Sequence, residues 1–177
     1  MLLLKEVPQY ECLLECSKRH PELDPSAMEA FLHLLRTSTD VFGAFRGLLA
    51  RHEISKGRFV VLILLNREPE KRVKLADLAD RADVTRATMT GLVDTLERDG
   101  FVRREEAPGD RRVVFVRLTT NGHTFLDGVL PDYFRRIAVL MCRLTEAERK
   151  TLVALLGKIQ QAVPDIQRDA SPKVAGS

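Results

Sequence analysis

The amino-acid sequence predicts a mainly α-helical protein with one small β-hairpin, a fold of the α+β class. Residues 73–120 contain two short helical patterns, a tight turn between them, and two strand patterns after them. Apolar residues recur at the spacing of long helices over residues 24–66 and 121–164. Helix, turn, helix and hairpin in this order predict a winged helix-turn-helix lobe over residues 67–120. The two flanking ranges predict an all-helical region built from both ends of the chain.

The first helix of the lobe is expected over about residues 75–82. Its apolar positions recur at helical spacing opposite charged residues, and they are Leu75, Leu78, Ala79 and Ala82. Asp83, Val84 and Thr85 then form the turn. Val84 is expected to fill the angle between the two helices. The Thr85 side chain is expected to cap the second helix by accepting a hydrogen bond from a free backbone N–H.

The second helix is expected from Arg86 to about Asp99, and Gly100 ends it because glycine adopts a left-handed backbone at the least cost. Its inner face consists of Met89, Leu92, Val93 and Leu96. Short hydroxyls and one guanidinium at its outer N-terminal face suit a major groove, where Arg bonds guanine, Thr bonds bases or phosphates, and Ala touches a thymine methyl. The predicted DNA-reading residues are Thr85, Arg86, Ala87, Thr88 and Thr90. The alternative is a solvated first turn on an ordinary helical hairpin.

The hairpin is expected from strands at residues 101–104 and 113–118, which are rich in β-branched and aromatic residues. Pro108-Gly109-Asp110 favours a turn, so Asp110, Arg111 and Arg112 are expected on the connecting loop. Arginines projecting beside a reading helix suit a narrow minor groove, where the negative potential is strong. Asp110 can hold one guanidinium in place through a charge-assisted hydrogen bond. The alternative is an ordinary surface ion pair on a hairpin.

Two segments of this lobe resemble the MarR family of bacterial transcription regulators. They read LADLADRADVTRATMTGLVDTLERDGFVRR and GDRRVVFVRLTTNG. The family's wing signature, an acid two residues before an arginine and then a strand ending in Leu-Thr, falls on Asp110, Arg112 and Leu118-Thr119. The resemblance extends more weakly over residues 27–163. It implies a homodimer with two lobes, sequence-specific binding to double-stranded DNA, and a response to a small-molecule effector.

Two positions depart from the family pattern. The family's turn glycine is Asp83 here, and the turn is expected to be kept because Asp tolerates a left-handed backbone better than most residues. Gly91 stands where the family often has Arg or another long polar residue. Glycine within a helix costs about 1 kcal/mol relative to alanine. Either one DNA contact is therefore missing, or the backbone lies close to a neighbour at this position.

The chain before the lobe is expected to form three helices. Residues 1–22 predict an N-terminal helical extension. Residues 24–66 predict two long helices, the first started by Asp24-Pro25 and the second capped by Ser55, which are residue types favoured at helix N-termini.

After the lobe, residues 121–164 predict two further helices. Pro131 should kink the first of them, because proline removes a helix hydrogen bond and clashes one turn back. Thr145 to Glu148 form a capping box for the second. Pro164 is expected to stop that helix, which leaves residues 165–177 as a mobile tail.

Composition and charge exclude several function classes. With 177 residues, 45% of them hydrophobic, the chain fits one domain or one domain with tails. Its net charge is only +3, and residues 67–118 carry twelve basic and eleven acidic side chains, so DNA binding must rest on particular arginines. Three cysteines without a disulfide framework indicate a reducing, cytoplasmic location. Cys12 and Cys16 are expected to be small packing residues, and the alternative is a redox-sensing role. No apolar run is long enough for a membrane span.

The sequence contains no constellation for catalysis or metal binding. The four histidines do not occur at metal-ligand spacings, and neither a Gly-rich phosphate loop nor a nucleophile elbow is present. We therefore expect no enzyme activity, no metal and no cofactor. The alternative function is a winged helix used for protein–protein contact without DNA binding. The polar face of residues 85–90 and the arginine-tipped wing argue against it.

The leading hypothesis is a homodimeric repressor that binds an inverted-repeat operator and is released by a small aromatic or lipophilic acid. The MarR resemblance implies an effector crevice between the dimer helices and the lobe. Aromatic walls with one cation suit a phenolic or carboxylate ligand, and residues of these types are His33, Arg36, Phe42, Phe45, Arg58, Phe59, Tyr133 and Met141. The alternative is that these aromatics are core residues and the arginines are solvated.

Overall fold

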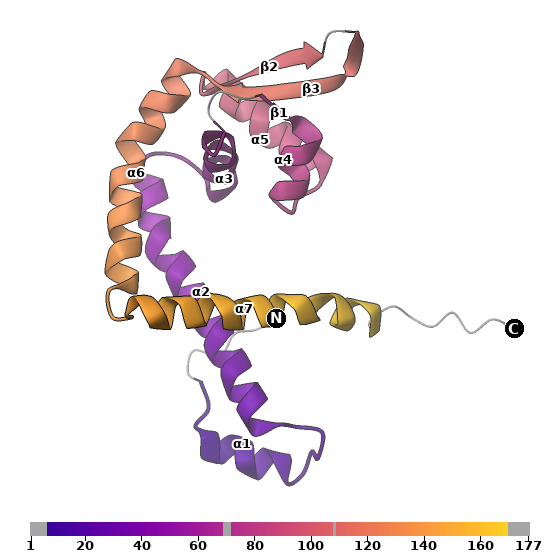
Figure 1. Ribbon diagram of the computed structural model, residues 1–177, viewed down its shortest axis with the longest axis vertical. Coiled ribbons are helices and arrows are strands. Elements are labelled where there is room, and N and C mark those ends of the chain that lie inside the picture. The colour runs from indigo at the N-terminus through magenta and orange to yellow at the C-terminus, as the bar shows by residue number, and fades with distance from the viewer. Residues whose placement is uncertain (1–6, 69–71, 108, 170–177) are drawn as a thin grey trace, which may run out of the picture. The chain divides into compact units, whose positions relative to one another are not determined.

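The structure is a computed structural model that describes residues 7–68, 72–107 and 109–169 (Figure 1). Within these ranges, the side chains of Ala107, Asp110, Arg111, Arg112, Gln167 and Asp169 lie outside the described set. The chain divides into two compact units, one ending at Val129 and the other beginning at Leu130. The elements are mostly helices with one small antiparallel sheet, which confirms the predicted fold class.

Three helices precede the lobe, as predicted. They are α1 (Tyr10–Ser17), α2 (Pro25–Arg51) and α3 (Lys56–Asn66). The carboxylate of Asp24 caps α2 by accepting hydrogen bonds from the backbone N–H of Ser26 at 2.9 Å and of Ala27 at 3.2 Å. The Ser55 hydroxyl caps α3 by accepting from the backbone N–H of Arg58 at 3.4 Å. Both caps satisfy N–H groups that have no partner within the helix.

The two helices of the helix-turn-helix also follow the prediction. They are α4 (Leu75–Arg81) and α5 (Arg86–Arg98). Asp83 in the turn has φ of 52°, so it keeps the left-handed backbone for which the family uses glycine. Gly100 follows α5 with φ of +76°, and the adjacent Phe101 backbone N–H bonds to the Leu96 carbonyl at 2.9 Å. These two left-handed residues set the directions in which the chain enters and leaves α5.

The sheet has three antiparallel strands in the order β1-β3-β2. They are β1 (Val73–Lys74), β2 (Val102–Ala107) and β3 (Asp110–Leu118). The prediction that Asp110 to Arg112 lie on a loop is wrong, because β3 already begins at Asp110, which pairs with Ala107 across an irregularity in the register. Gly109 has φ of +87°, a conformation that permits a much shorter connection than a loop of several residues.

The core of the first unit lies between the sheet and helices α3, α4 and α5, which cover one face of it (Figure 1). Its side chains come from every element of the lobe and from α2 and α6, and the largest fully buried ones include Leu48, Leu62, Leu65, Leu78, Met89, Leu96 and Leu126. Burying a side chain of this size stabilises the fold by about 1.5–3 kcal/mol. This core holds α5 in place, and α2 and α6 contribute to it from outside the lobe.

The start of α6 (Thr120–Met141) is fixed to this platform by a close approach of two backbones. A Cβ atom on Gly122 would lie 2.1 Å from the Phe101 carbonyl oxygen, so only glycine fits there. The Thr119 hydroxyl accepts from the Gly122 backbone N–H at 3.0 Å and donates to the Gly100 carbonyl at 2.7 Å. The Phe101 and Phe125 rings then pack with centroids 4.6 Å apart. The direction of α6 out of the lobe is thus set within its first two turns.

The second unit contains the end of α6 and the whole of α7 (Glu146–Asp169). The capping box is confirmed: Thr145 Oγ1 accepts from the Glu148 backbone N–H at 3.3 Å, and Glu148 accepts from the Thr145 backbone N–H at 2.7 Å. The Glu148 carboxylate also accepts from the Thr145 hydroxyl at 2.8 Å. The bonds that it accepts from Thr145, the one from the backbone N–H first and the one from the hydroxyl second, hold the pKa of Glu148 below its usual value. The predicted kink at Pro131 stays a prediction.

The prediction that Pro164 stops the last helix is wrong, because α7 continues to Asp169 with Pro164 in its interior. An interior proline removes one hydrogen bond but leaves the bonds on either side, so a helix can continue past it. An ion pair between Asp165 and Arg168 at 3.4 Å links residues one turn apart in the continued segment. Of the predicted mobile tail, residues 165–169 are therefore helical, and residues 170–177 lie outside the described residues.

Candidate nucleic-acid interface

Helix α5 divides sharply into a buried and an exposed side. Met89, Val93 and Leu96 are fully buried against the lobe. The predicted reading residues Thr85, Arg86, Ala87, Thr88 and Thr90 are all exposed at the opposite side of its first turns. The packing therefore fixes which face of α5 is available to a partner, and Ala87 is the one residue named on this face without a polar side chain.

The hydroxyls on this face are already arranged by local hydrogen bonds. Thr85 Oγ1 accepts from the Thr88 backbone N–H at 3.1 Å and lies 2.9 Å from Thr88 Oγ1. Thr90 Oγ1 donates to the Arg86 carbonyl at 2.9 Å. Since a hydroxyl has one proton and two lone pairs, Thr90 can only accept from a partner. It therefore suits an amino group of cytosine or adenine better than a phosphate oxygen.

The start of α5 is electrostatically suited to an anion. No acidic residue lies in its first turn, and the free N–H groups of a helix N-terminus carry partial positive charge. An open hollow of about 460 Å³ lies beside it, lined by Ala79, Asp80, Asp83, Val84 and Thr85. The two carboxylates of this hollow repel phosphates, so they mark the edge of the surface on the α4 side.

The wing is attached to α5 by an ion-pair cluster around Arg104 on β2. Its guanidinium lies 2.8 Å from a Glu97 carboxylate oxygen and 2.7 Å from Asp94. The same Glu97 accepts from the Arg104 backbone N–H at 2.8 Å, and the guanidinium also donates to the Thr90 carbonyl at 3.2 Å. This cluster, defined by Arg104, Glu97 and Asp94, holds the wing strand against the reading helix. It was not predicted, because no spacing pattern in the sequence points to it.

The predicted wing residues can be placed by their backbone alone. Asp110, Arg111 and Arg112 form the start of β3, directly after the turn. Their side chains lie outside the described residues, so the ion pair expected between Asp110 and an arginine stays a prediction. The strand position puts all three at the end of the hairpin farthest from Val102 and Leu118, which pair at its base.

The surroundings of Gly91 decide between the two explanations that the sequence offered for this glycine. It is exposed, and an added Cβ would meet nothing within 4 Å among the described atoms. A close backbone neighbour is therefore not the reason for this glycine. The remaining interpretation is a missing contact, because open space stands where the family often carries a long polar side chain.

The predicted effector residues of the first unit fall into different environments. Phe59 is only 5% exposed and belongs to the core, so it does not line an open crevice, in agreement with the core alternative. Phe42 is 55% exposed, with Lys56 Nζ 3.8 Å from its ring centre. His33 is exposed, and Arg36 pairs with Asp40 at 2.8 Å.

Arg58 has a more specific setting. Its guanidinium donates to Asp99, the residue directly after the reading helix. The side chain is 16% exposed, and its Nε is buried without a hydrogen-bond partner among the described residues. Tyr133 and Met141 belong to the other unit, where the Tyr133 ring lies 5.9 Å from that of Phe134. Within the first unit, Arg58 is therefore the predicted cation that links α3 to the reading helix.

Three packed helices, an exposed polar N-terminus on the reading helix, and a wing anchored to that helix define a winged helix-turn-helix DNA-binding regulator. The sequence profile of the MarR family matches residues 54–114. The transcriptional repressor YetL of Bacillus subtilis is 34% identical over 156 residues, which cover 88% of this chain and 93% of YetL. The chain therefore belongs to the MarR family of transcription regulators.

Solved structures give the same result. The crystal structure of the transcriptional regulator PA4135 is 30% identical, with a TM-score of 0.65 over 74% of this chain and 95% of that one. The regulator BpsR of Bordetella bronchiseptica is 27% identical, with a TM-score of 0.62 over 72% of this chain and 96% of BpsR. The similarity thus includes the long helices as well as the lobe.

Neither a membrane-spanning helix nor a metal site is found in the described part of the chain. No helix within it is both long and apolar enough to cross a membrane. Among the same residues, no group of three or more His, Cys, Asp or Glu side chains is placed to hold a metal ion.

Proposed function

We propose that this regulator is a homodimeric repressor that binds an inverted-repeat operator with one reading helix and one wing per half-site. The observation that carries this proposal is the exposed polar face at the start of α5, on a helix whose other side is fully buried. The residues assigned to DNA are Thr85, Arg86, Ala87, Thr88 and Thr90 on α5, and Asp110, Arg111 and Arg112 on the wing. YetL, the similar protein from Bacillus subtilis, is a transcriptional repressor.

Exposed apolar side chains support the dimer. From Leu130 to Asp169, none of the described side chains is buried. One face of α7 nevertheless carries large apolar side chains that are 37–70% exposed, and they are Leu152, Leu155, Ile159, Val163 and Ile166. Soluble proteins rarely expose a contiguous apolar stripe of this length unless a partner covers it. A second copy supplies a matching stripe, because a two-fold interface pairs the same surface with itself.

The operator half of the proposal is tested with genomic fragments selected by the purified protein. We expect an inverted repeat whose half-site centres lie about one helical turn, roughly 34 Å, apart. Arg86→Ala and Thr88→Ala should change base preference at one position, by about 1–3 kcal/mol for a bidentate contact. Arg112→Ala should weaken binding to all sequences and flatten its salt dependence.

Arg135→Ala is the matched control, because this exposed arginine lies on α6, outside the lobe. It should leave operator affinity unchanged. Wild-type affinity of Arg112→Ala at several salt concentrations would contradict the wing assignment. Failure of the protein to select any fragment would favour the alternative of a protein-binding winged helix.

We further propose that a small aromatic carboxylate releases the repressor from its operator. DNA binding by the similar regulator BpsR is regulated by 6-hydroxynicotinic acid, an aromatic acid. The candidate residues for such a ligand in the first unit are His33, Arg36, Phe42 and Arg58. Arg58 is favoured as the anchor for the carboxylate, because its buried Nε has no partner among the described residues and its guanidinium already binds one carboxylate, that of Asp99. A ligand at Arg58 thereby acts on the residue that follows the reading helix.

The effector is sought by screening aromatic acids for a rise in melting temperature and a loss of operator affinity. A ligand can shift the protein between two states only by its differential affinity for them, so both readouts should move together. Arg58→Ala should reduce both shifts, and Arg36→Ala should have a smaller effect. Asp99→Asn serves as the control, since it removes the competing carboxylate and keeps the guanidinium, and should therefore strengthen ligand binding. A screen in which neither readout moves would contradict the effector proposal.

A further inference from the structure

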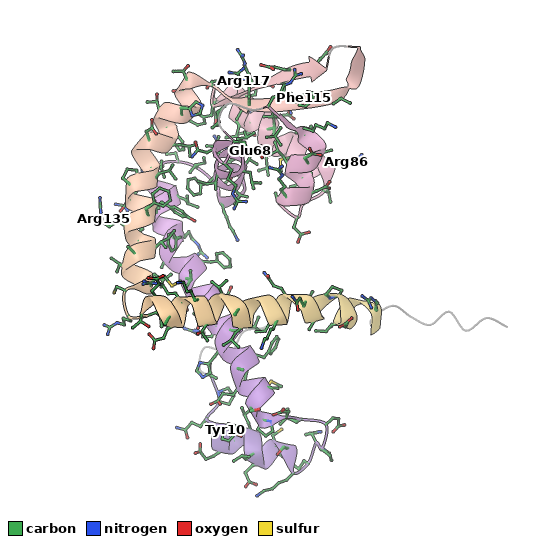
Figure 2. All side chains as sticks on the ribbon, in the orientation of Figure 1. Tyr10, Glu68, Arg86, Phe115, Arg117 and Arg135 are labelled. Atoms are coloured by element: carbon green, nitrogen blue, oxygen red, sulfur yellow. The ribbon has the colours of Figure 1, made fainter. Side chains whose placement is uncertain are left out.

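The sheet of the lobe has two unlike faces. Its inner face packs on the helices through Val73, Val102, Val116 and Leu118, all of them buried. Side chains alternate along a strand, so the intervening residues of each strand point away from the helices. The pairing register, together with the contact between Arg72 and Phe115, defines an outer sheet face composed of Arg72, Lys74, Arg103, Glu105, Phe115 and Arg117. Figure 2 labels Arg117 and Phe115 on the sheet, and Arg86 at the reading helix.

This face is strongly basic. It carries four cations and one carboxylate, that of Glu105, which lies 3.0 Å from Arg103, 3.7 Å from Arg117 and 3.8 Å from Arg72. One carboxylate cannot neutralise three guanidinium groups, so the face retains a net positive charge. The three arginine side chains are 42–57% exposed. Their charge is therefore accessible to a partner.

The placement of like charges on this face lowers the stability of the sheet when no partner is bound. Arg103 and Arg117 lie directly opposite each other in the β2–β3 register, and like charges at such positions destabilise a sheet. Glu105 offsets part of this repulsion by contacting both. Arg72 is held in another way, with its guanidinium 4.3 Å from the centre of the Phe115 ring. The guanidinium groups are thus held in a fixed array before any partner binds.

We propose that the outer sheet face binds phosphates of the duplex DNA that flanks the operator half-site. Guanidinium groups in a fixed array match phosphate oxygens with paired hydrogen bonds. The strands that carry the face, β2 and β3, are also the strands of the wing, on which Asp110, Arg111 and Arg112 are assigned to DNA. An acidic protein is a less suitable partner, because Arg72 already covers the ring of Phe115, which would otherwise serve as an aromatic anchor. This inference rests on the proposed operator binding.

The test compares two duplexes, a minimal operator and the same operator extended by about one helical turn on each side. Wild type should bind the extended duplex more tightly, with a steeper salt dependence. The double variant Arg103→Gln with Arg117→Gln should lose this gain and bind the minimal duplex as wild type does. Two lost phosphate contacts should lower the salt slope by about 1.8 for each bound protomer, or about twelvefold in affinity over a fourfold change in salt.

Three further variants separate charge from structure. Arg98→Gln removes the same charge from an arginine of the lobe that is 76% exposed on α5, away from the sheet, and should change nothing. Arg103→Lys with Arg117→Lys should keep most of the length dependence. Glu105→Gln removes the carboxylate and should therefore raise the affinity for the extended duplex. If Glu105 had a structural role alone, the same substitution would lower this affinity. Melting temperatures of the free variants verify that each one is folded.

Each outcome decides the proposal. If wild type binds both duplexes equally, or if the double variant to glutamine keeps the length dependence, the flanking-DNA assignment is wrong, and an acidic protein surface becomes the candidate partner. If no operator is recognised but binding to random-sequence duplex still depends on Arg103 and Arg117, the operator proposal and the assignment to operator-flanking DNA both fail, whereas phosphate binding by the outer sheet face stands. If neither duplex is bound, both proposals fail.

Discussion

Large apolar side chains are buried in the lobe but exposed in the unit that begins at Leu130. In the lobe, Met89, Val93 and Leu96 of α5 are 0% exposed, because α3, α4 and the sheet surround them. In the unit that begins at Leu130, Val139 and Val153 are 68% and 70% exposed. Both regions have the same kind of amphipathic helix in their sequence. The difference shows that an apolar stripe specifies one side of a helix, but not whether that side is buried within the same chain.

The largest effect is expected when charges are introduced into the exposed apolar stripe of α7. Leu155→Glu with Ile159→Glu should raise the dissociation constant of the dimer by at least about a thousandfold, because each buried unpaired carboxylate costs several kcal/mol. Sedimentation velocity measures the change. Gln161→Glu, which helical periodicity places opposite the stripe, is the control and should remain dimeric. A double variant that stays dimeric at micromolar concentration would show that α7 does not form the interface.

The lobe should respond to the loss of internal packing instead. Met89→Ala removes a side chain that is 0% exposed and should lower the free energy of unfolding by about 2–5 kcal/mol, through lost burial and the cavity left behind. Denaturant unfolding measures it. Arg98→Ala, an exposed change on the same helix, should stay within about 0.5 kcal/mol of wild type. Equal losses for the two variants would mean that α5 is not packed as described.

A smaller effect is expected where the wing is attached to the reading helix. Arg104→Met keeps the apolar stem but removes the guanidinium that contacts Glu97 and Asp94, and should cost about 1–2 kcal/mol, since hydrogen bonds to charged groups on a half-buried side chain are lost. Its neighbour on the outer sheet face provides the control: Arg103→Met should change stability by less than about 0.5 kcal/mol. The rate of backbone amide hydrogen exchange in β2 should rise in Arg104→Met and not in Arg103→Met. If it rises in both or in neither, the cluster around Arg104 does not fix the wing.

The smallest effect concerns the exposed cap of α7. Hydrogen bonds from Thr145 lower the pKa of Glu148 in the folded protein relative to its ordinary value of 4.5. The carboxylate therefore stabilises the fold above about pH 4.5, and this contribution is lost as the pH falls through the lowered folded value. The melting temperature of Glu148→Gln should lie below that of wild type at pH 7, and the gap should narrow in acid. A difference in melting temperature that does not change with pH would contradict a stabilising role for the charge of Glu148.

The local structure of this chain was largely predictable from its sequence. The caps at Asp24, Ser55 and Thr85 and the capping box at Thr145 act between residues two or three positions apart, so short segments are sufficient to specify them. The left-handed turn at Asp83 was predicted for the same reason. The prediction at Pro164 was wrong because a proline restricts a helix locally without forcing it to end.

The contacts that organise the site needed the folded chain. Arg104 meets Glu97 and Asp94 only because the chain reverses at Gly100, and Arg103 meets Arg117 only because the hairpin register places them opposite each other. No spacing in the sequence encodes either pairing. The burial of Phe59, which the sequence predicted as a ligand contact, likewise depends on packing from several elements.

The sequence by itself therefore determined the fold class, the family, and the face of α5 that is exposed, since hydrophobic periodicity and local capping are properties of neighbouring residues. Tertiary structure decided how the wing is held, why Gly122 must be glycine, and where the basic outer face of the sheet lies. These features depend on residues brought together from distant positions in the chain. Strand register and backbone packing, rather than local propensity, control such contacts.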